Sequence, residues 1–377
     1  MFKSLISNSR RRQFFNLLGF YAAYLWFRSF SSSVLSPHFA NEGLTIEQMI
    51  LGTLYTFVGA GLLMILTNKI SARLSWGLSF IASFLSILLI MRIANPAQFY
   101  LASVISGLYI PLFYIAYNIA HYRLTPAHRT GYSSAIMFSI FPIVGLVAPL
   151  AAGWLAEINY LYVWIFSGIF FLITFLLTKF QTNFLIKYDL VAGWRAIKST
   201  RIIVFLQGIW EALPFGIIPV FSLHFIKSPL YYGTFIAYLS LMSVIANLVL
   251  GYLSDKFKRR LAFLYPIALT MAVATFVFPL VTANLIFWLI LTGVIQFLCP
   301  LFWNFSASWF VDQQPDHDRS MPIRELVLAI GRIVGLFFAW ISFRFETIPV
   351  YIFYFLGVIM LLYPVVLLYN TRHAAKF

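Results

Sequence analysis

Glu211 and Arg28 are the residues best suited to chemistry in this sequence, because each interrupts a long apolar segment. Glu211 lies ten residues after Arg201. A helix rises about 1.5 Å per residue, so Glu211 lies roughly 15 Å into an apolar layer of about 30 Å. Burial in such a layer opposes the charged form of a carboxylate and favours proton uptake. We therefore predict that Glu211 exchanges a proton or binds a cationic group, and that Arg28 binds an anionic one.

Structural ion pairs are the alternative for these buried charges. Arg28 lies sixteen residues after Arg12, which gives a depth of about 24 Å by the same rise. Glu211 and Arg28 would then neutralise each other inside a helical bundle. Arg332 follows Glu325 by seven residues, so these two lie on one helix face and are predicted to pair structurally.

Polar and aromatic residues accompany the charges in four segments, and in each segment they follow helical spacing and share one face. The sets are Tyr21, Tyr24, Arg28 and Ser32; Tyr114, Tyr117, Asn118 and His121; Gln207, Trp210, Glu211 and Pro214; and Gln296, Pro300, Trp303 and Asn304. We predict that these four faces line a polar cavity that binds a substrate. The alternative for any one set is that it only packs helices together.

The elements that position these residues are twelve apolar segments. Hydrophobic residues are 62% of the chain and charged residues 10%, so lipid rather than water must surround much of it. A bilayer core needs about 20 helical residues. Continuous apolar runs such as 170–177 exclude the alternation of a transmembrane barrel. The predicted spans are 14–36, 47–67, 74–94, 98–120, 132–154, 160–180, 202–225, 231–253, 261–281, 285–309, 323–343 and 349–369.

The distribution of basic residues predicts the orientation. Most of the 26 lysines and arginines fall at the amino terminus or in every second connection. The opposite connections hold Arg92, Lys227 and Arg344. This bias predicts that both termini are cytoplasmic. A bacterial inner membrane is expected as the location.

The longest internal polar stretch divides the chain after the sixth span. It predicts an amino-terminal six-helix bundle over residues 1–180, a cytoplasmic linker over 181–201 and a carboxyl-terminal bundle over 202–377. At an offset of 190, Arg129 aligns with Arg319 and residues 143–146 align with 333–336. Such parallel repeats are typical of one transporter class, in which substrate binds between the two halves.

Two motifs resemble the major facilitator superfamily. After span 8, Gly251, Leu253, Asp255, Lys256, Arg259 and Arg260 match its loop signature, although Lys258 stands where the family has glycine. Residues 145–153 are similar to the Gly-Pro motif of its antiporters, but small residues there would also permit close helix packing. The resemblance implies an all-α membrane fold of twelve helices in two pseudo-symmetric bundles, and a transporter.

The resemblance also implies a gate on the cytoplasmic side. Asp255, with Lys256 and Arg259 beside it, would lie near a neighbouring helix and pair with Arg129. A second latch would join Asn68, where the family has an acid, to Arg324 and Glu325. This latch should be the weaker one, because an amide replaces a carboxylate.

Secondary active transport of a small molecule by alternating access is therefore the predicted function, with proton coupling and export or antiport favoured. A uniporter without proton coupling is one alternative. An enzyme of the membrane prenyltransferase type is another, because Asp312, Asp316 and Asp318 have suggestive spacing, but a second acidic cluster for magnesium is missing. We expect no catalytic residue, cofactor, metal ion or nucleic acid. The expected partners are the substrate, protons and the lipid bilayer, with the protein a monomer.

Overall fold

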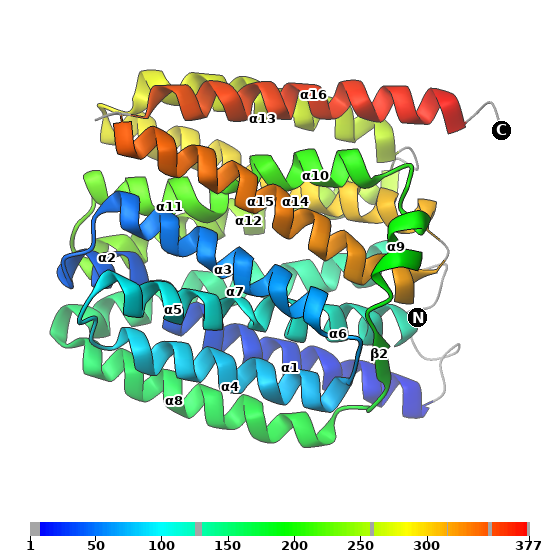
Figure 1. The fold of residues 1–377 in the computed structure, drawn as a ribbon, viewed down its shortest axis with the longest axis horizontal. Helices are drawn as coiled ribbons and strands as arrows, with labels where there is room; N and C mark the ends of the chain where they lie inside the picture. The colour runs from blue at the N-terminus through cyan, green and yellow to red at the C-terminus, as the bar shows by residue number, and fades with distance from the viewer. Residues whose placement is uncertain (1–7, 125–129, 257–259, 315, 346–348, 375–377) are drawn as a thin grey trace.

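The computed structural model describes the chain except for residues 1–7, 125–129, 257–259, 315, 346–348 and 375–377. Almost all of it is helical (Figure 1). The elements are α1 (Asn8–Ser32), α2 (Leu35–Asn41), α3 (Ile46–Leu66), β1 (Lys69–Ser71), α4 (Ala72–Ile90), α5 (Pro96–Gly107), α6 (Tyr109–Leu124), α7 (Thr130–Ile158), α8 (Tyr160–Leu177), η2 (Thr178–Phe180), β2 (Leu185–Lys187), α9 (Leu190–Ala196), α10 (Arg201–Trp210), η3 (Leu213–Ile217), α11 (Ile218–Phe221), η4 (Ser222–His224), α12 (Pro229–Lys256), α13 (Arg260–Val281), α14 (Leu285–Gln313), α15 (His317–Phe345) and α16 (Val350–Ala374).

Ten helical segments in the described part of the chain are long and apolar enough to cross a membrane. This confirms the predicted all-α membrane protein. The other two predicted spans correspond to α1, which carries Arg28, and to α7, of which 143–158 is an apolar helix of shorter length. The count of twelve spans stays a prediction.

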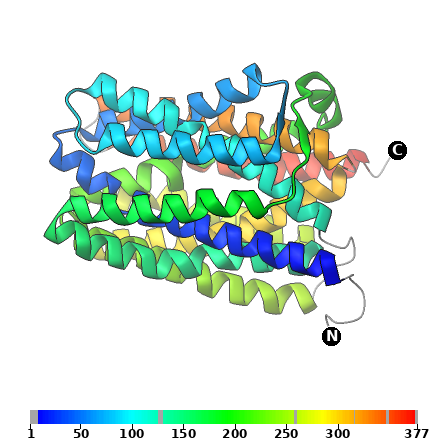
Figure 2. The same cartoon turned by 90° about the horizontal axis from the view of Figure 1, so that it is seen from below.

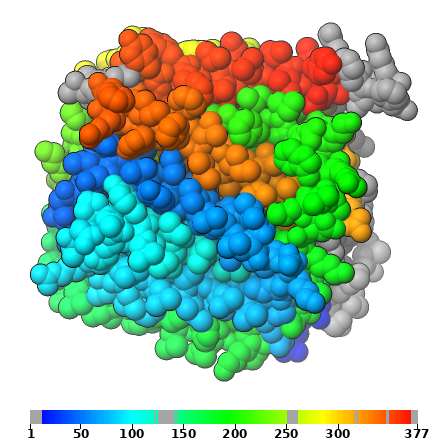
Figure 3. Space-filling model, viewed as in Figure 1, coloured from blue at the N-terminus to red at the C-terminus, as the bar shows by residue number. Residues whose placement is uncertain are grey.

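The two parts of the chain lie side by side. In Figure 1 helices α1 to α8 fill the lower half and α10 to α16 the upper half. They meet along two helix pairs, α3 against α15 and α7 against α12. The space-filling view in Figure 3 shows α3 and α15 packed along the middle of one face. Helix α1 begins and helix α16 ends on the same side (Figures 1 and 2), here called the terminal side.

Helices that begin on the opposite side have side-chain caps. Thr45 and Gln48 form a reciprocal capping box at the start of α3. Asn95, Asn159 and Asn284 each accept a backbone N–H at the start of α5, α8 and α14. A free N–H in the first turn of a helix needs such an acceptor. These caps therefore fix where the helices begin.

The residues between the two halves form a strap on the terminal side. Strand β2 pairs antiparallel with β1, with Ile186 opposite Ile70. Helix α9 packs against the start of α15, where Gly193 lies so close to the backbone oxygen of Arg319 that an added Cβ would be 2.8 Å from it. The linker is therefore attached to both halves.

The Gly-Pro segment of α7 serves close packing. A Cβ added to Gly153 would lie 3.2 Å from the Cα of Gly233 on α12, and one added to Gly233 would lie 2.3 Å from the carbonyl oxygen of Pro149. A Cβ added to Gly145 would meet Ser240 at 2.6 Å. Small residues let two helix backbones approach in this way. The packing interpretation of this motif thus has a direct structural basis.

Candidate functional site

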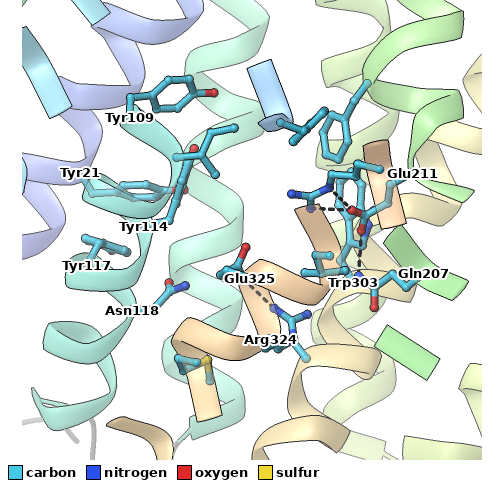
Figure 4. A pocket seen from close by; sticks show the side chains of 17 residues that line it. Tyr21, Tyr109, Tyr114, Tyr117, Asn118, Gln207, Glu211, Trp303, Arg324 and Glu325 are labelled. Atoms are coloured by element: carbon cyan, nitrogen blue, oxygen red, sulfur yellow. Dashed lines mark hydrogen bonds and ion pairs between the residues drawn. The ribbon is translucent and has the colours of Figure 1, made fainter. Parts of the chain in front are cut away.

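A cavity of about 310 Å³ lies between the two halves. It takes one wall from α1, α3 and α6, and the other from α10, η3, α14 and α15 (Figure 4). The lining residues are Tyr21, Phe57, Tyr109, Ile110, Tyr114, Tyr117, Asn118, Gln207, Glu211, Phe215, Trp303, Ala307, Met321, Arg324, Glu325, Leu328 and Arg332. This volume is at the lower end of the range for small-molecule sites.

Glu211 forms a buried ion pair with Arg332 on the second wall. The Arg332 Nε donates to Oε2 of Glu211 at 2.7 Å, and Nη2 of the same guanidinium contacts the same oxygen. Glu211 is 1% exposed and Arg332 9%. The predicted alternatives are thus corrected: Arg332, not Arg28, neutralises Glu211, and Glu325 is not the partner of Arg332.

A chain of hydrogen bonds holds the other oxygen of Glu211. Gln207 Nε2 donates to Oε1 of Glu211 at 2.8 Å, and Ser306 Oγ donates to Oε1 of Gln207 at 2.8 Å. Tyr363 donates its hydroxyl proton to Ser306 at 3.0 Å. The side chains in this series of hydrogen bonds come from α10, α14 and α16. A satisfied network of this kind holds the carboxylate in one orientation.

Two backbone features bring Glu211 to Arg332. Regular helix ends at Trp210, and Leu213–Ile217 continue as a π-helical turn that contains Pro214. Short π-helical turns inside helices are frequent at functional sites. Helices α10 and α15 also approach at glycines, since a Cβ on Gly331 would lie 2.8 Å from the Cα of Gly208. This contact is within a turn of the ion pair on both helices.

Aromatic rings surround the guanidinium of Arg332. Its Cζ lies 5.0 Å from the ring centroid of Phe57 and 5.1 Å from that of Phe215. Phe215 in turn stacks on Trp303 with centroids 5.7 Å apart. A cation within about 6 Å of a ring centroid is attracted to that ring. Because Phe57 is on α3 and Phe215 on η3, Arg332 contacts both halves of the protein.

Tyrosines form the facing wall. The Tyr21 and Tyr117 rings stack with centroids 4.4 Å apart. Tyr109, Tyr114 and Asn118 extend this wall along α6 (Figure 4). Stacked rings offer flat apolar surface, and Asn118 adds an amide that both donates and accepts hydrogen bonds. The two walls are thus chemically different: this one is aromatic and has no charged lining residue, whereas the other combines two ion pairs with the rings of Phe215 and Trp303.

The remaining predicted site residues point elsewhere. Arg28 is over the ring of Tyr109 at 3.9 Å. Tyr24 stacks on Phe113 at 3.4 Å, Trp210 donates to Thr275 on α13, and Gln296 donates to Ser243 on α12. Asn304 is 5% exposed. None of these five is among the lining residues of the described cavity. Tyr24, Trp210 and Gln296 contact neighbouring helices, as in the packing alternative for their faces, whereas Arg28 lies behind Tyr109, which lines the cavity.

Both the sequence and the fold are similar to those of known proteins. Residues 200–377 match the family model of the Major Facilitator Superfamily. A bacterial homologue of the iron transporter ferroportin in its outward-facing state has a similar structure, with a TM-score of 0.71, 13% identity, and 96% of this chain and 99% of that chain covered. The nucleoside transporter NupG gives a TM-score of 0.66, 12% identity, and coverage of 96% and 99%. A bacterial metal transporter gives 0.63, 14%, and 98% and 100%. No curated protein matches the sequence.

The predicted resemblance to the major facilitator superfamily is thereby confirmed. The family match covers residues 200–377, and the fold of the whole chain is similar to the folds of these transporters. Identities of 12–14% carry the fold alone. The substrates named for the similar structures are therefore those of the similar proteins.

Only part of the gate predicted on the terminal side lies within the described residues. Arg129 and Arg259 lie outside the described residues, and so do the side chains of Asp255 and Lys256. Arg324 donates to Glu325 at 3.0 Å, and both line the cavity. Asn68 accepts the backbone N–H of Tyr188 in the strap. That bond uses the backbone oxygen of Asn68, so it does not involve the predicted side chain. Among the described residues the expected latch to Asn68 is not formed, and Arg324 and Glu325 pair with each other instead.

Contacts that the sequence did not predict join the two halves on the opposite side. Glu47 at the start of α3 pairs with Arg344 at 3.2 Å and accepts from Trp340 at 3.2 Å, both on α15. Glu157 near the end of α7 accepts from Ser228 Oγ at 2.8 Å and from the backbone N–H of Leu230 at 3.2 Å, at the start of α12. Each interface between the halves thus has a carboxylate from the first half bound to the second.

Several lining residues were not predicted from the sequence. Arg332 could have been predicted as one of them. An arginine in the middle of a predicted span requires a buried partner, and Glu211 is the acid at matching depth. Phe57, Phe215 and Tyr109 carry no comparable signal, because an aromatic ring in a membrane helix is equally common in packing. Tyr114 was predicted on the face of span 4 and does line the cavity.

Proposed function

We propose that this transporter moves a small organic molecule with a flat ring by alternating access around the central cavity. The observation that carries the proposal is the pairing of an aromatic wall with a neutralised ionic wall across one cavity between the halves. Glu211 with Arg332 and Arg324 with Glu325 each sum to zero charge. A neutral or zwitterionic substrate therefore fits better than an ion of high charge.

Metal ions are named for two of the similar structures, but the cavity does not favour them here. Hard cations take several oxygen ligands, whereas Glu211 and Glu325 are each bound to an arginine. Within the part of the chain that the structure describes, no three potential metal ligands cluster. A nucleoside, which is the substrate class in the name of another similar structure, has the flat ring and neutral polar groups that these walls suit.

We also propose that Glu211 couples transport to protons. Proton uptake by the carboxylate would remove the charge that holds Arg332, and the guanidinium would then be available to an acceptor group of the substrate. Because Arg332 touches Phe57 and Phe215, its release would change a contact between the halves. Antiport, which the Gly-Pro segment of α7 predicts, remains a prediction, since its glycines contact α12 whatever the direction.

Reconstituted protein tests these proposals. Ligands would first be found by thermal shift against nucleosides, aromatic amino acids and divalent metal ions, because a ligand that binds the folded state raises the melting temperature. For a ligand so found, uptake into liposomes would be measured with and without a pH gradient. We expect Glu211→Gln to abolish uphill transport and to retain exchange at equal concentrations.

The matched control is Glu42→Gln, which changes a carboxylate outside the cavity that binds the backbone of Ile93. It should leave coupled transport unchanged. Full gradient-driven uptake by Glu211→Gln would rule out the coupling role and leave a uniporter or a different coupling residue. Stabilisation by metal ions alone would overturn the proposed substrate class.

A further inference from the structure

A second cavity lies far from the central one, between α12 and α14. It has a volume of about 490 Å³. Its lining residues are Phe225, Ile226, Lys227, Tyr231, Thr234, Phe235, Tyr238, Leu285, Ile286, Leu289 and Ile290. Helix α14 contributes to both cavities, but among the described residues they share no lining residue. This cavity, here called the α12–α14 groove, is therefore not part of the substrate site.

The floor of the α12–α14 groove presents hydrocarbon. The hydroxyl of Tyr238 donates to the backbone oxygen of Leu289 at 3.0 Å, and Thr234 Oγ1 donates to the backbone oxygen of Leu230 at 2.9 Å. The hydroxyl groups of Tyr238 and Thr234 thus bind within the protein. The rim is exposed, with Tyr231 at 69% and Ile286 at 67%. In a protein whose helices cross a bilayer, such an exposed apolar surface faces acyl chains.

The length of the groove matches one leaflet. It begins where α12 and α14 begin and reaches Tyr238, which is nine residues after Pro229. Nine residues of helix rise roughly 14 Å. This is about half of a hydrocarbon core of about 30 Å. The groove therefore accommodates an acyl chain that enters from the opposite side, not one that crosses the bilayer.

Lys227 adds a charge at the mouth of the groove. It precedes α12 by two residues, at the level where headgroups lie. Of the basic residues that the sequence places on this side, Arg344 is bound to Glu47. In the described part of the chain Lys227 has no ion pair. Glu157 is the carboxylate near Lys227, and it accepts hydrogen bonds from Ser228 and from the backbone N–H of Leu230. The Lys227 ammonium is therefore available to an anion.

We propose that the α12–α14 groove binds one phospholipid of the leaflet on the opposite side, with an acyl chain in the groove and the phosphate on Lys227. An apolar channel of leaflet depth and a single ammonium at its mouth are the two features that a phospholipid needs. An anionic headgroup should be preferred to a zwitterionic one, because a choline ammonium competes with Lys227 for the phosphate.

Purified protein in detergent tests this proposal by native mass spectrometry and thermal shift. The probes are dioleoyl phosphatidylglycerol, dioleoyl phosphatidylcholine and inorganic phosphate. We expect one phosphatidylglycerol per protein to be retained, with weaker retention of phosphatidylcholine and no effect of inorganic phosphate. Lys227→Gln should weaken phosphatidylglycerol binding about fivefold, which is the contribution of one interfacial lysine.

Two further variants separate the site from general surface effects. Thr234→Phe fills the groove and should reduce binding of both lipids. Arg92→Gln removes another exposed basic residue of the same side and should change neither. Melting curves without added lipid would verify that each variant folds. Equal losses in Arg92→Gln and Lys227→Gln, unchanged lipid binding in Thr234→Phe, or stabilisation by inorganic phosphate equal to that by lipid would each overturn the proposal.

Discussion

At the scale of single residues, the ion pair between Glu211 and Arg332 determines how substitution of either residue changes the stability of the protein. Glu211→Gln leaves the Arg332 guanidinium buried without a carboxylate, and Arg332→Gln leaves Glu211 in the same condition. Breaking a buried pair by removing one member costs about 3–5 kcal/mol. We expect either single variant to lose that much stability and the double variant to regain part of it, as measured by melting of the purified protein.

Arg28 provides the control for this cycle. It is over the ring of Tyr109 and not beside Glu211. The effects of Arg28→Gln and Glu211→Gln should therefore add, as they do for residues without shared contacts. A rescue of Glu211→Gln by Arg28→Gln instead of by Arg332→Gln would contradict the ion pair described above.

A buried histidine outside the spans predicts a pH dependence of stability. His38 on α2 bonds through Nε2 to the backbone oxygen of Ile90 at 2.7 Å. Burial lowers the pKa of His38 below its usual 6.5, and this outweighs the opposite effects of the Ile90 bond and Glu42. When the pH falls below about 6.5, the unfolded chain takes up a proton before the folded one does, so stability falls.

Melting temperatures between pH 7.5 and 5.5 check this expectation. The loss should be at most about 1.4 kcal/mol per pH unit, and His38→Gln, which can still donate to Ile90, should show less of it. His224→Gln changes an exposed histidine and is the matched control. If His38→Gln and the unmodified protein lost stability in parallel, His38 would not be the source.

At the scale of elements, helix contacts at glycine hold the ionic wall together. A Cβ on Gly331 would meet the backbone oxygen of Phe205 at 2.6 Å and the Cα of Gly208 at 2.8 Å. We expect Gly331→Ala to push α10 from α15 and to cost about 1–3 kcal/mol. Gly77→Ala is the control, since its nearest neighbour, a ring carbon of Phe175, would be 3.9 Å away. Equal melting temperatures for the two variants would contradict this.

The helices and the depth of Glu211 could be predicted from sequence, but the rotation of each helix about its axis could not. Apolar length and the position of Glu211 are properties of one segment. Whether Trp210 or Gln207 faces the cavity depends on a rotation of α10 that is set by its contacts with α13 and α15. The partner of Glu211 is 121 residues away in sequence, so spacing on one helix could not reveal it. Arg332 was assigned to Glu325 for that reason.

At the scale of the whole molecule, the two carboxylate contacts on the opposite side predict how the halves separate. Glu47 and Glu157 bind α15 and the start of α12, one at each interface between the halves. The double variant Glu47→Gln, Glu157→Gln replaces charge-assisted bonds by weaker neutral ones. One spin label would be placed on α3 and one on α15, each at the end of the helix that lies on the opposite side. The fraction of molecules with a long distance between the two labels should be larger than in the unmodified protein. With Glu42→Gln the distances should not change.

The strap on the terminal side limits how the halves can part there. Strand β2 and the flanking Tyr188 are bonded to the end of α3 and to β1, and α9 starts at Leu190 on the surface of α15. Only Asp189 separates the two attachments. Because one residue cannot span a large gap, the ends of α3 and α15 must stay close together on the terminal side. An opening on the terminal side should then be lopsided, narrow beside α3 and α15 and widest between α7 and α12, so that a substrate leaves or enters along one flank of the protein.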